Sequence, residues 1–276
     1  MTPPKPTHPD TPEVKARLKA KPGPKASSKP KPKPKPRAKL KPAAAPARRT
    51  GVMTGAPIPR LGWPPDEDRV ELIFQRLSAI MPEPKTELTF QNPYTLVVAV
   101  ALSAQATDVS VNKATDRLFK VADTPEAMLA LGEEGLIPYI ASIGLYRGKA
   151  RNVIALSRIV LEQHGGVMPL NRADLQALPG VGRKTASVVL NELGIEPAIA
   201  VDTHVFRVSH RLGLANAATA DKVEDQLHAV VPADWLAKAH HWLILHGRYN
   251  CTARRPDCAG CVISDLCPSR MALAAG

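Results

Sequence analysis

The amino-acid sequence predicts an all-α fold. Beyond Trp63, apolar residues recur at helical spacing, and polar capping residues and short connections separate the helical stretches. No sustained alternation of apolar and polar residues predicts a β-strand. With 44% hydrophobic residues, the chain can form a substantial core. One predicted buried helical face consists of Val70, Ile73, Phe74 and Leu77.

The first helices are marked by residues that can cap their N-terminal N–H groups. Asp66 or Asp68 can cap a helix that ends near Met81. Proline follows the capping residue in the next two cases, as is common at the first helical position. These two helices are expected from Asn92 to Leu102 and from Thr124 onward.

Three later helices are expected in the part of the chain that carries the chemistry. They are a short one at 172–177, one that follows Gly182 and ends at Gly194, and one capped by Asp202 or Thr203. The middle helix has a buried face at i, i+3, i+4 and i+7. That face consists of Ala186, Val189, Leu190 and Leu193.

Residues 1–60 differ from the rest in composition. They hold 11 Lys and 5 Arg against two acidic residues, a net charge of +14, whereas residues 61–276 carry about −2. The Lys-Pro repeat at 29–36 cannot fold, because proline removes donors and the lysines repel one another. We therefore expect a disordered basic arm. One interpretation is a solubilising segment, or a wrongly assigned N-terminus with Met53 as the alternative start. The other is an arm that adds salt-sensitive affinity for DNA phosphates.

The most informative segment is Leu178-Pro-Gly-Val-Gly-Arg-Lys184. Gly180 and Gly182 permit left-handed backbone angles and a close approach to the main chain. A turn that leads into a helix N-terminus presents N–H groups suited to an anion. The segment therefore predicts a helix-hairpin-helix that binds a DNA phosphate without reading sequence. A turn without function is the alternative.

Lys184 is a candidate nucleophile. It lies in the first helical turn, about 200° around the helix from Ala186, so it should point away from the core. A cation there opposes the helix dipole, and Arg183 adds a second unfavourable charge. That repulsion favours the neutral amine, the form that a lysine nucleophile requires. A solvated or phosphate-contacting lysine is the alternative.

Asp202 follows in the motif Val201-Asp-Thr-His204. A capping carboxylate is favoured in its ionised form by the helix dipole. If it faces Lys184, it can stabilise positive charge that develops on a sugar as a glycosidic bond breaks. Capping alone also explains an aspartate at this position.

All four cysteines of the chain lie within 17 residues, in the pattern C-x6-C-x2-C-x5-C. This placement excludes a disulfide framework spread over the chain. Four thiolates at this spacing suit a tetrahedral zinc site or an iron-sulfur cluster, and general ligand rules do not choose between them. The expected ligands are Cys251, Cys258, Cys261 and Cys267.

Two kinds of basic residue lie near the cysteines. Arg254 and Arg255 fall in a loop that a bound metal would hold rigid, so they can form a phosphate-contacting patch or simply be solvated. His240, His241 and His246 precede the cysteines. Because four cysteines already complete a site, we interpret these histidines as packing and hydrogen-bonding residues.

Residues from about 66 to 267 closely resemble endonuclease III. Several independent motifs in the same order make chance similarity negligible. Besides the cysteine pattern, they are Leu102-Ser-Ala-Gln-Ala-Thr-Asp108, Ile143-Gly-Leu-Tyr146, Leu178-Pro-Gly-Val-Gly-Arg-Lys184, Val201-Asp-Thr-His204 and His246-Gly-Arg-Tyr249.

The resemblance implies a two-lobed helix-hairpin-helix DNA glycosylase fold. A six-helix barrel domain would span 86–197, and an iron-sulfur domain would combine 61–85 with 198–276. The C-terminal cysteine loop would hold a 4Fe-4S cluster, whose role would be to order the arginine loop. DNA would lie across the cleft between the lobes.

The resemblance also implies a bifunctional DNA N-glycosylase and AP lyase of base excision repair. Its partner would be double-stranded DNA containing oxidised pyrimidines, such as thymine glycol, or abasic sites. Gln105 and Leu145 would fill the gap left by the flipped nucleotide. Lys184 would attack C1′ while Asp202 assists departure of the base, and β-elimination from the Schiff base would cut 3′ to the site. Gln176 departs from the glutamate often found in this family.

Two other readings compete with this one. The mismatch adenine glycosylase shares the hairpin and the cluster, but it resembles this chain less because it looks to lack a lysine at the position of Lys184 and carries a further C-terminal domain. A non-catalytic or redox-sensing DNA-binding module needs neither Lys184 nor Asp202.

The sequence also leads to expectations about where the protein is located in the cell and whether it forms oligomers. No apolar stretch reaches the roughly 18 residues of a transmembrane helix, and the N-terminus lacks the apolar core of a secretory signal. We expect a cytoplasmic, nucleoid-associated monomer with no membrane partner.

Overall fold

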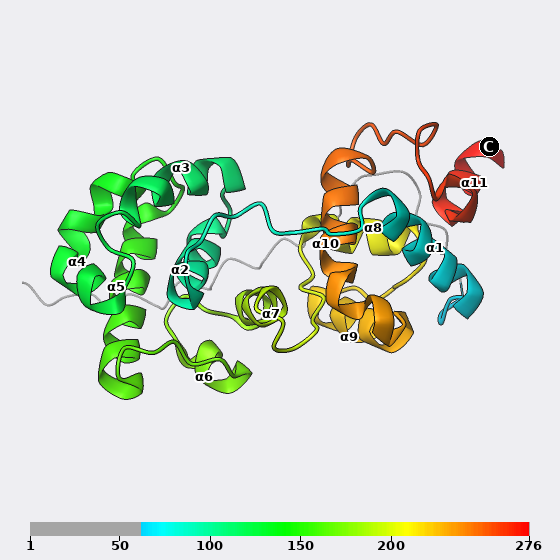
Figure 1. Cartoon of the computed structure of the whole chain (residues 1–276). Coiled ribbons are helices and arrows are strands. Elements are labelled where there is room, and N and C mark those ends of the chain that lie inside the picture. The colour runs from blue at the N-terminus through cyan, green and yellow to red at the C-terminus, as the bar shows by residue number, and fades with distance from the viewer. Residues whose placement is uncertain (1–61, 276) are drawn as a thin grey trace, which may run out of the picture. The chain divides into compact units, whose positions relative to one another are not determined.

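The computed structural model describes residues 62–275, and every regular element in that range is a helix, which confirms the all-α prediction (Figure 1). The basic arm predicted at 1–60 lies outside the described residues. None of the described helices is long and apolar enough to cross a membrane. In chain order they are α1 (Glu67–Ile80), α2 (Pro93–Ser103), α3 (Asp108–Leu118), α4 (Pro125–Ile140), α5 (Tyr146–His164), α6 (Arg172–Ala177), α7 (Arg183–Glu192), α8 (Thr203–Arg211), α9 (Ala220–Val230), α10 (Ala233–Tyr249), the 3₁₀ helix η1 (Ser264–Leu266) and α11 (Pro268–Ala275).

The helix starts follow the predicted caps. Asp66, Asn92 and Thr124 precede α1, α2 and α4, and each side chain accepts a hydrogen bond from the backbone N–H three residues ahead. Such bonds satisfy N–H groups that have no partner inside the helix. α6 has the predicted bounds, and Asp202 rather than Thr203 caps α8.

Two glycines end or interrupt helices where the predictions were less accurate. α7 ends at Glu192, two residues before the predicted end, because Gly194 adopts a φ of 67° and the N–H of Ile195 bonds to the Leu190 carbonyl. α4 is interrupted at Gly132, which has a φ of 69° and a ψ of 175°. No feature of the sequence predicted this interruption.

The first hydrophobic core surrounds α2. Nine consecutive residues of this helix, 94–102, are buried, as expected for a helix enclosed on all sides. α2 contacts α3, α5 and α7, and α4 packs along α5. The buried apolar residues of this core lie between Leu88 and Leu190, so it includes the buried face of α7.

The second core joins α1 to the C-terminal part of the chain. α1 and α8 both pack on α10, and the indole N–H of Trp242 donates to the carbonyl oxygen of Met81 at 2.8 Å. The core residues lie at 70–77 and 199–263, and Cys251, Cys261 and Cys267 pack against them. The domain boundaries at 86 and 198 stay predictions.

Candidate active site and cysteine centre

The turn between α6 and α7 exposes the N-terminus of α7. Gly180 has a φ of +83°, and a Cβ there would lie 3.1 Å from the Cβ of Asn152. Gly182 is the N-cap residue and makes no side-chain cap hydrogen bond to the first N–H groups of α7. These groups form the kind of site that binds an anion.

Lys184 and Asp202 begin two successive helices. Lys184 is exposed in the first turn of α7, whereas Ala186 on the same helix is fully buried, so Lys184 points away from the core as predicted. One carboxylate oxygen of Asp202, Oδ1, accepts the backbone N–H groups of His204 and Val205, each at 2.8 Å. This capping bond fixes the orientation of the carboxylate.

His240 of α10 is a buried residue with a strongly lowered pKa. Its side chain is 4% exposed. Burial and the neighbouring His241 lower the pKa of His240 to about 3, while the charge of Asp202 raises it and that of Lys184 lowers it further. The lowered pKa keeps this buried imidazole neutral near pH 7.

Arg183 is held by α9. Its guanidinium lies 2.8 Å from a Glu224 carboxylate oxygen and 2.7 Å from one of Asp225. The hydrogen bond to Asp225 is the main cause that raises the pKa of Arg183. The side chain predicted to contact DNA thus joins the hairpin to the second core, and its DNA contact stays a prediction.

Gln105 and Leu145 adopt left-handed backbone angles, with φ of 57° and 59°, and no other non-glycine residue described by the structure has a positive φ. Leu145 is 69% exposed, and Gln105 is exposed as well. Both residues line a pocket of about 250 Å³ together with Gly180. The structure therefore places Gln105 and Leu145, the two residues predicted to fill the gap in the DNA and here called the wedge residues, beside the hairpin glycine Gly180. Strained backbone of this kind is common at functional sites.

A second pocket, of about 540 Å³, includes residues to which the sequence assigned no role. Arg248, at the end of α10, bonds to Asp108 of α3 at 2.5 Å and also to Glu87, and the Tyr249 hydroxyl donates to Glu87. Asp108, Arg248 and Tyr249 belong to motifs that carry the family resemblance, but only the tertiary structure shows that they meet. His204 of α8 lines the same pocket.

None of the four cysteines is paired in a disulfide, and all four are partly buried. Burial is the main cause that raises the pKa of Cys261 and Cys267, and the charges of the other cysteines add to it. Among the described residues, no group of three or more His, Cys, Asp or Glu side chains is arranged to hold a single metal ion. Arg211 donates to Cys251 Sγ at 3.3 Å, so a cation lies beside the first cysteine. A donor set of thiolates with a neighbouring arginine fits an iron-sulfur cluster.

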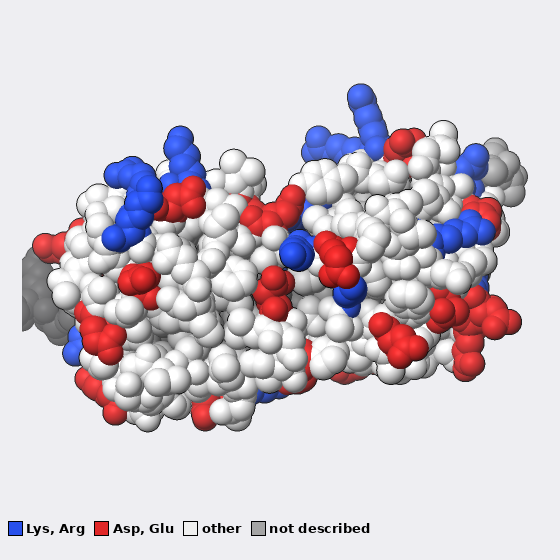
Figure 2. All heavy atoms as spheres, viewed as in Figure 1, with Lys and Arg blue, Asp and Glu red and all other residues white. Residues whose placement is uncertain are grey.

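Two arginines of α8 hold the loop after Cys251. Arg207 donates to the Cys251 carbonyl at 3.1 Å, and Arg211 donates to the carbonyls of the next two residues at 2.8 and 2.9 Å. Sequence reasoning missed both arginines, although their spacing of one helical turn was a signal. Arg254 and Arg255 in this loop are exposed. Figure 2 shows Lys and Arg side chains projecting beside this loop and beside α3.

The sequence predicted packing and hydrogen-bonding roles for the three histidines of α10, and the structure shows polar contacts for two of them. His241 Nε2 lies 3.1 Å from a Glu192 carboxylate oxygen, which joins α10 to α7. His246 Nε2 lies 3.8 Å from Cys261 Sγ. The Nδ1 of His240 has no hydrogen-bond partner among the described residues.

Two family models match the chain. Residues 98–233 match the HhH-GPD superfamily of base excision DNA repair proteins. Residues 251–267, from the first cysteine to the last, match the iron-sulfur binding domain of endonuclease III. The second match confirms the predicted 4Fe-4S cofactor.

Relatives and solved structures agree with these matches. Endonuclease III of Escherichia coli K12 is 58% identical over 195 residues, which cover 71% of this chain and 92% of that protein. Endonuclease III of Rickettsia conorii is 56% identical over 198 residues, which cover 72% and 94%. A trapped covalent intermediate of endonuclease III with DNA superposes with a TM-score of 0.72 at 40% identity, covering 76% of this chain and 99% of that one. Similarity of this extent, over nearly the whole length of each relative, shows that the chain belongs to the endonuclease III family.

Proposed function

We propose that this protein excises oxidised pyrimidines of the thymine glycol type from double-stranded DNA and then cleaves the strand 3′ to the abasic site. The observation that carries the proposal is the placement of Lys184, exposed in the first turn of α7, and of Asp202, whose carboxylate is held as the cap of α8. A nucleophile and a carboxylate at the starts of neighbouring helices are the pair that a glycosylase with lyase activity requires.

The chemistry begins when the neutral amine of Lys184 attacks C1′ of the flipped nucleotide. The bond from C1′ to the base nitrogen breaks, the base leaves with the electron pair, and the attacking nitrogen loses a proton. The Asp202 carboxylate stabilises positive charge on the sugar during this step. Opening of the bond from C1′ to the ring oxygen then gives a Schiff base. Loss of a C2′ proton to this electron sink breaks the bond from C3′ to the 3′ phosphate oxygen.

The remaining predicted site residues would hold and distort the DNA. The N–H groups after Gly180 and Gly182 would bind a phosphate. Gln105 and Leu145 would enter the gap left by the flipped nucleotide, which offsets the loss of base stacking. Because Arg254 and Arg255 are exposed on the cysteine loop, they are suited to contact further phosphates.

The cysteine centre would support this DNA contact. Cys251, Cys258, Cys261 and Cys267 would hold the 4Fe-4S cluster, and the bound cluster would supply a rigid anchor for the loop. Arg211 would balance part of the negative charge of the thiolates, and its bonds to the loop carbonyls would keep the arginine patch in place.

The test is covalent trapping by borohydride on duplex DNA with an abasic site or thymine glycol. We expect an adduct with the native protein and none with Lys184→Gln, while DNA binding is largely retained. Lys222→Gln is a matched control, because Lys222 is also exposed in the first turn of a helix. An undiminished adduct in Lys184→Gln would contradict the mechanism. A panel of defined lesions, including adenine mismatches, would separate the proposed substrate from that of an adenine glycosylase.

We also propose that the protein acts as a monomer on nucleoid DNA. Every residue assigned to the reaction and to DNA binding belongs to one chain, so no second copy is needed to complete the site. Light scattering after size-exclusion chromatography, with and without duplex DNA, measures this directly. A stable dimer in both samples would contradict the proposal.

A further inference from the structure

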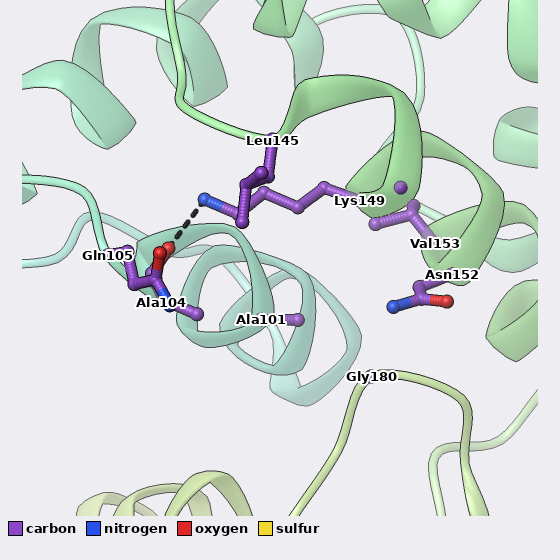
Figure 3. A pocket seen from close by; sticks show the side chains of 9 residues that line it. Ala101, Ala104, Gln105, Leu145, Lys149, Asn152, Val153 and Gly180 are labelled. Carbon is purple, nitrogen blue, oxygen red and sulfur yellow. Dashed lines mark hydrogen bonds between the residues drawn. The ribbon is translucent and has the colours of Figure 1, made fainter. Parts of the chain in front are cut away.

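Lys149 is a buried lysine between the two turns that carry Gln105 and Leu145. It lies in the first turn of α5 and is 8% exposed. Its ammonium donates to the carbonyl oxygen of Ala104 at 2.7 Å (Figure 3) and to that of Leu102 at 2.9 Å. Desolvation lowers the pKa of Lys149. A lysine is rarely buried unless its charge is satisfied, and here main-chain carbonyls satisfy it.

These carbonyls belong to the C-terminal end of α2. The last carbonyls of a helix have no partner inside it, and a cation near them is favoured by the helix dipole. The Ala104 carbonyl is part of the peptide group that leads into Gln105, so the bond from Lys149 fixes the orientation of that peptide. Gln105 needs such support, because a non-glycine residue persists in left-handed backbone only where its surroundings hold it.

The same lysine also contacts the second turn. The backbone N–H of Lys149 donates to the Leu145 carbonyl at 3.1 Å and closes the first turn of α5. The two turns approach each other closely, because a Cβ on Gly144 would lie 3.8 Å from the Gln105 carbonyl oxygen. Gln105, Leu145 and Lys149 all line the pocket of about 250 Å³. Lys149 is therefore a partner that both turns share.

We propose that Lys149 is a positioning residue for the DNA wedge: it fixes the Gln105 peptide through its ammonium and the Leu145 turn through its backbone, so that both side chains enter the gap together. The inference rests on the proposed function, because it requires that Gln105 and Leu145 fill the space left by the flipped nucleotide. Lys149 itself touches neither the reacting sugar nor the lesion in this role.

The principal variant is Lys149→Met, which keeps the length of the side chain and removes the ammonium. Wedge insertion is followed by the fluorescence of 2-aminopurine placed opposite an uncleavable abasic analogue, and turnover is measured on a thymine glycol duplex. We expect a reduced fluorescence change and a loss of kcat/KM on the order of tenfold, because small errors in positioning are costly. Lys149→Arg keeps the charge and the donors, and it is expected to retain most of the fluorescence change.

Tyr94→Phe is the matched control. The Tyr94 hydroxyl forms a buried hydrogen bond of 2.6 Å with the Ser157 hydroxyl, and this bond also joins α2 to α5. Its loss weakens the contact between the same two helices without touching the wedge turns. Tyr94→Phe should therefore leave the fluorescence change intact. Equal losses in Tyr94→Phe and Lys149→Met, or in the Arg and Met variants of Lys149, would overturn the positioning role.

A double-mutant cycle with Gln105→Ala separates the possible outcomes. If Lys149 acts through Gln105, adding Lys149→Met to Gln105→Ala should cause little further loss. If Gln105→Ala loses activity but Lys149→Met has no effect, or has an effect that simply adds to that of Gln105→Ala, the positioning role of Lys149 is overturned and the wedge assignment stands. A silent Gln105→Ala would overturn the wedge assignment and the role of Lys149 with it. Neither result touches the chemistry of Lys184, which borohydride trapping reports separately.

Discussion

At the scale of single residues, His240 has a property that the sequence did not predict, because the sequence assigned it only to packing and hydrogen bonding. His240 is buried in α10, and the charges of Lys184 and Asp202 also act on its pKa. The sequence could place Lys184 at a helix start and Asp202 at a cap, since both features are local. It could not show that the imidazole of His240 is buried and neutral, because burial depends on how the helices pack.

The lowered pKa of His240 predicts a loss of stability in acid. Its folded-state pKa of about 3 lies below the ordinary value of 6.5. Between these values the unfolded chain binds a proton that the folded chain does not, so the free energy of unfolding falls as pH falls from about 6.5 towards 3, by at most about 1.4 kcal/mol per pH unit. Urea unfolding at pH 7 and pH 5 measures this.

The variant His240→Gln removes the titrating group, so its stability should depend less on pH than that of the native protein. His164→Gln, at the end of α5, is the control and should keep the native dependence. Parallel pH dependence in the native protein and His240→Gln would show that His240 does not cause the loss.

Arg183 illustrates how a residue's partners can come from distant sequence. The sequence placed this arginine at a helix start, where its charge opposes the helix dipole and adds to that of Lys184. Two carboxylates of α9, Glu224 and Asp225, supply negative charge from about 40 residues further along the chain. The conflict seen in the sequence is thus relieved within the protein.

At the scale of elements, helix starts were predicted more accurately than helix ends. A cap such as Asp66 or Asn92 is recognised from a few neighbouring residues. The end of α7 instead depends on how the chain reverses through Gly194 after the last buried residue. Gly132, which interrupts α4, looks in the sequence like any glycine tolerated inside a helix.

The role of α8 leads to a prediction about the cysteine centre. Arg211 is 5% exposed and donates to Cys251 Sγ and to two carbonyls of the loop. Arg211→Met removes these partly buried bonds and leaves their acceptors without this partner. We expect the native protein to be brown with bound iron, and its visible absorbance to be lost several-fold faster under a chelator in Arg211→Met.

Arg76→Met is the control for this experiment. Arg76 also reaches the C-terminal segment, through an exposed ion pair with Asp265, but makes no bond to a cysteine. It should lose its absorbance at the native rate. A colourless native protein that contains zinc would refute the iron-sulfur cluster, and equal rates in both variants would refute the role of Arg211.

At the scale of the whole molecule, the positive charge is concentrated outside the described residues. Residues 1–60 carry a net charge of +14, whereas the whole chain carries +12, so residues 61–276 are slightly acidic at about −2. Deleting residues 1–60 should flatten the dependence of DNA affinity on salt, because fewer counterions are released on binding. It should not change which base is removed. Binding titrations from low to moderate salt measure the slope, and an unchanged slope would assign the arm no part in DNA binding.

The sequence by itself determined the helices, their caps, the hairpin glycines, the spacing of the cysteines and, through its motifs, the family. These features depend on neighbouring residues or on short fixed spacings. Only the tertiary structure decided which of them meet: α1 with α10 in one core, Arg183 with the carboxylates of α9, and the turns of Gln105 and Leu145 at Lys149. Such contacts join residues that are far apart in the chain. They depend on how the helices pack, and no pattern of neighbouring residues predicts that packing.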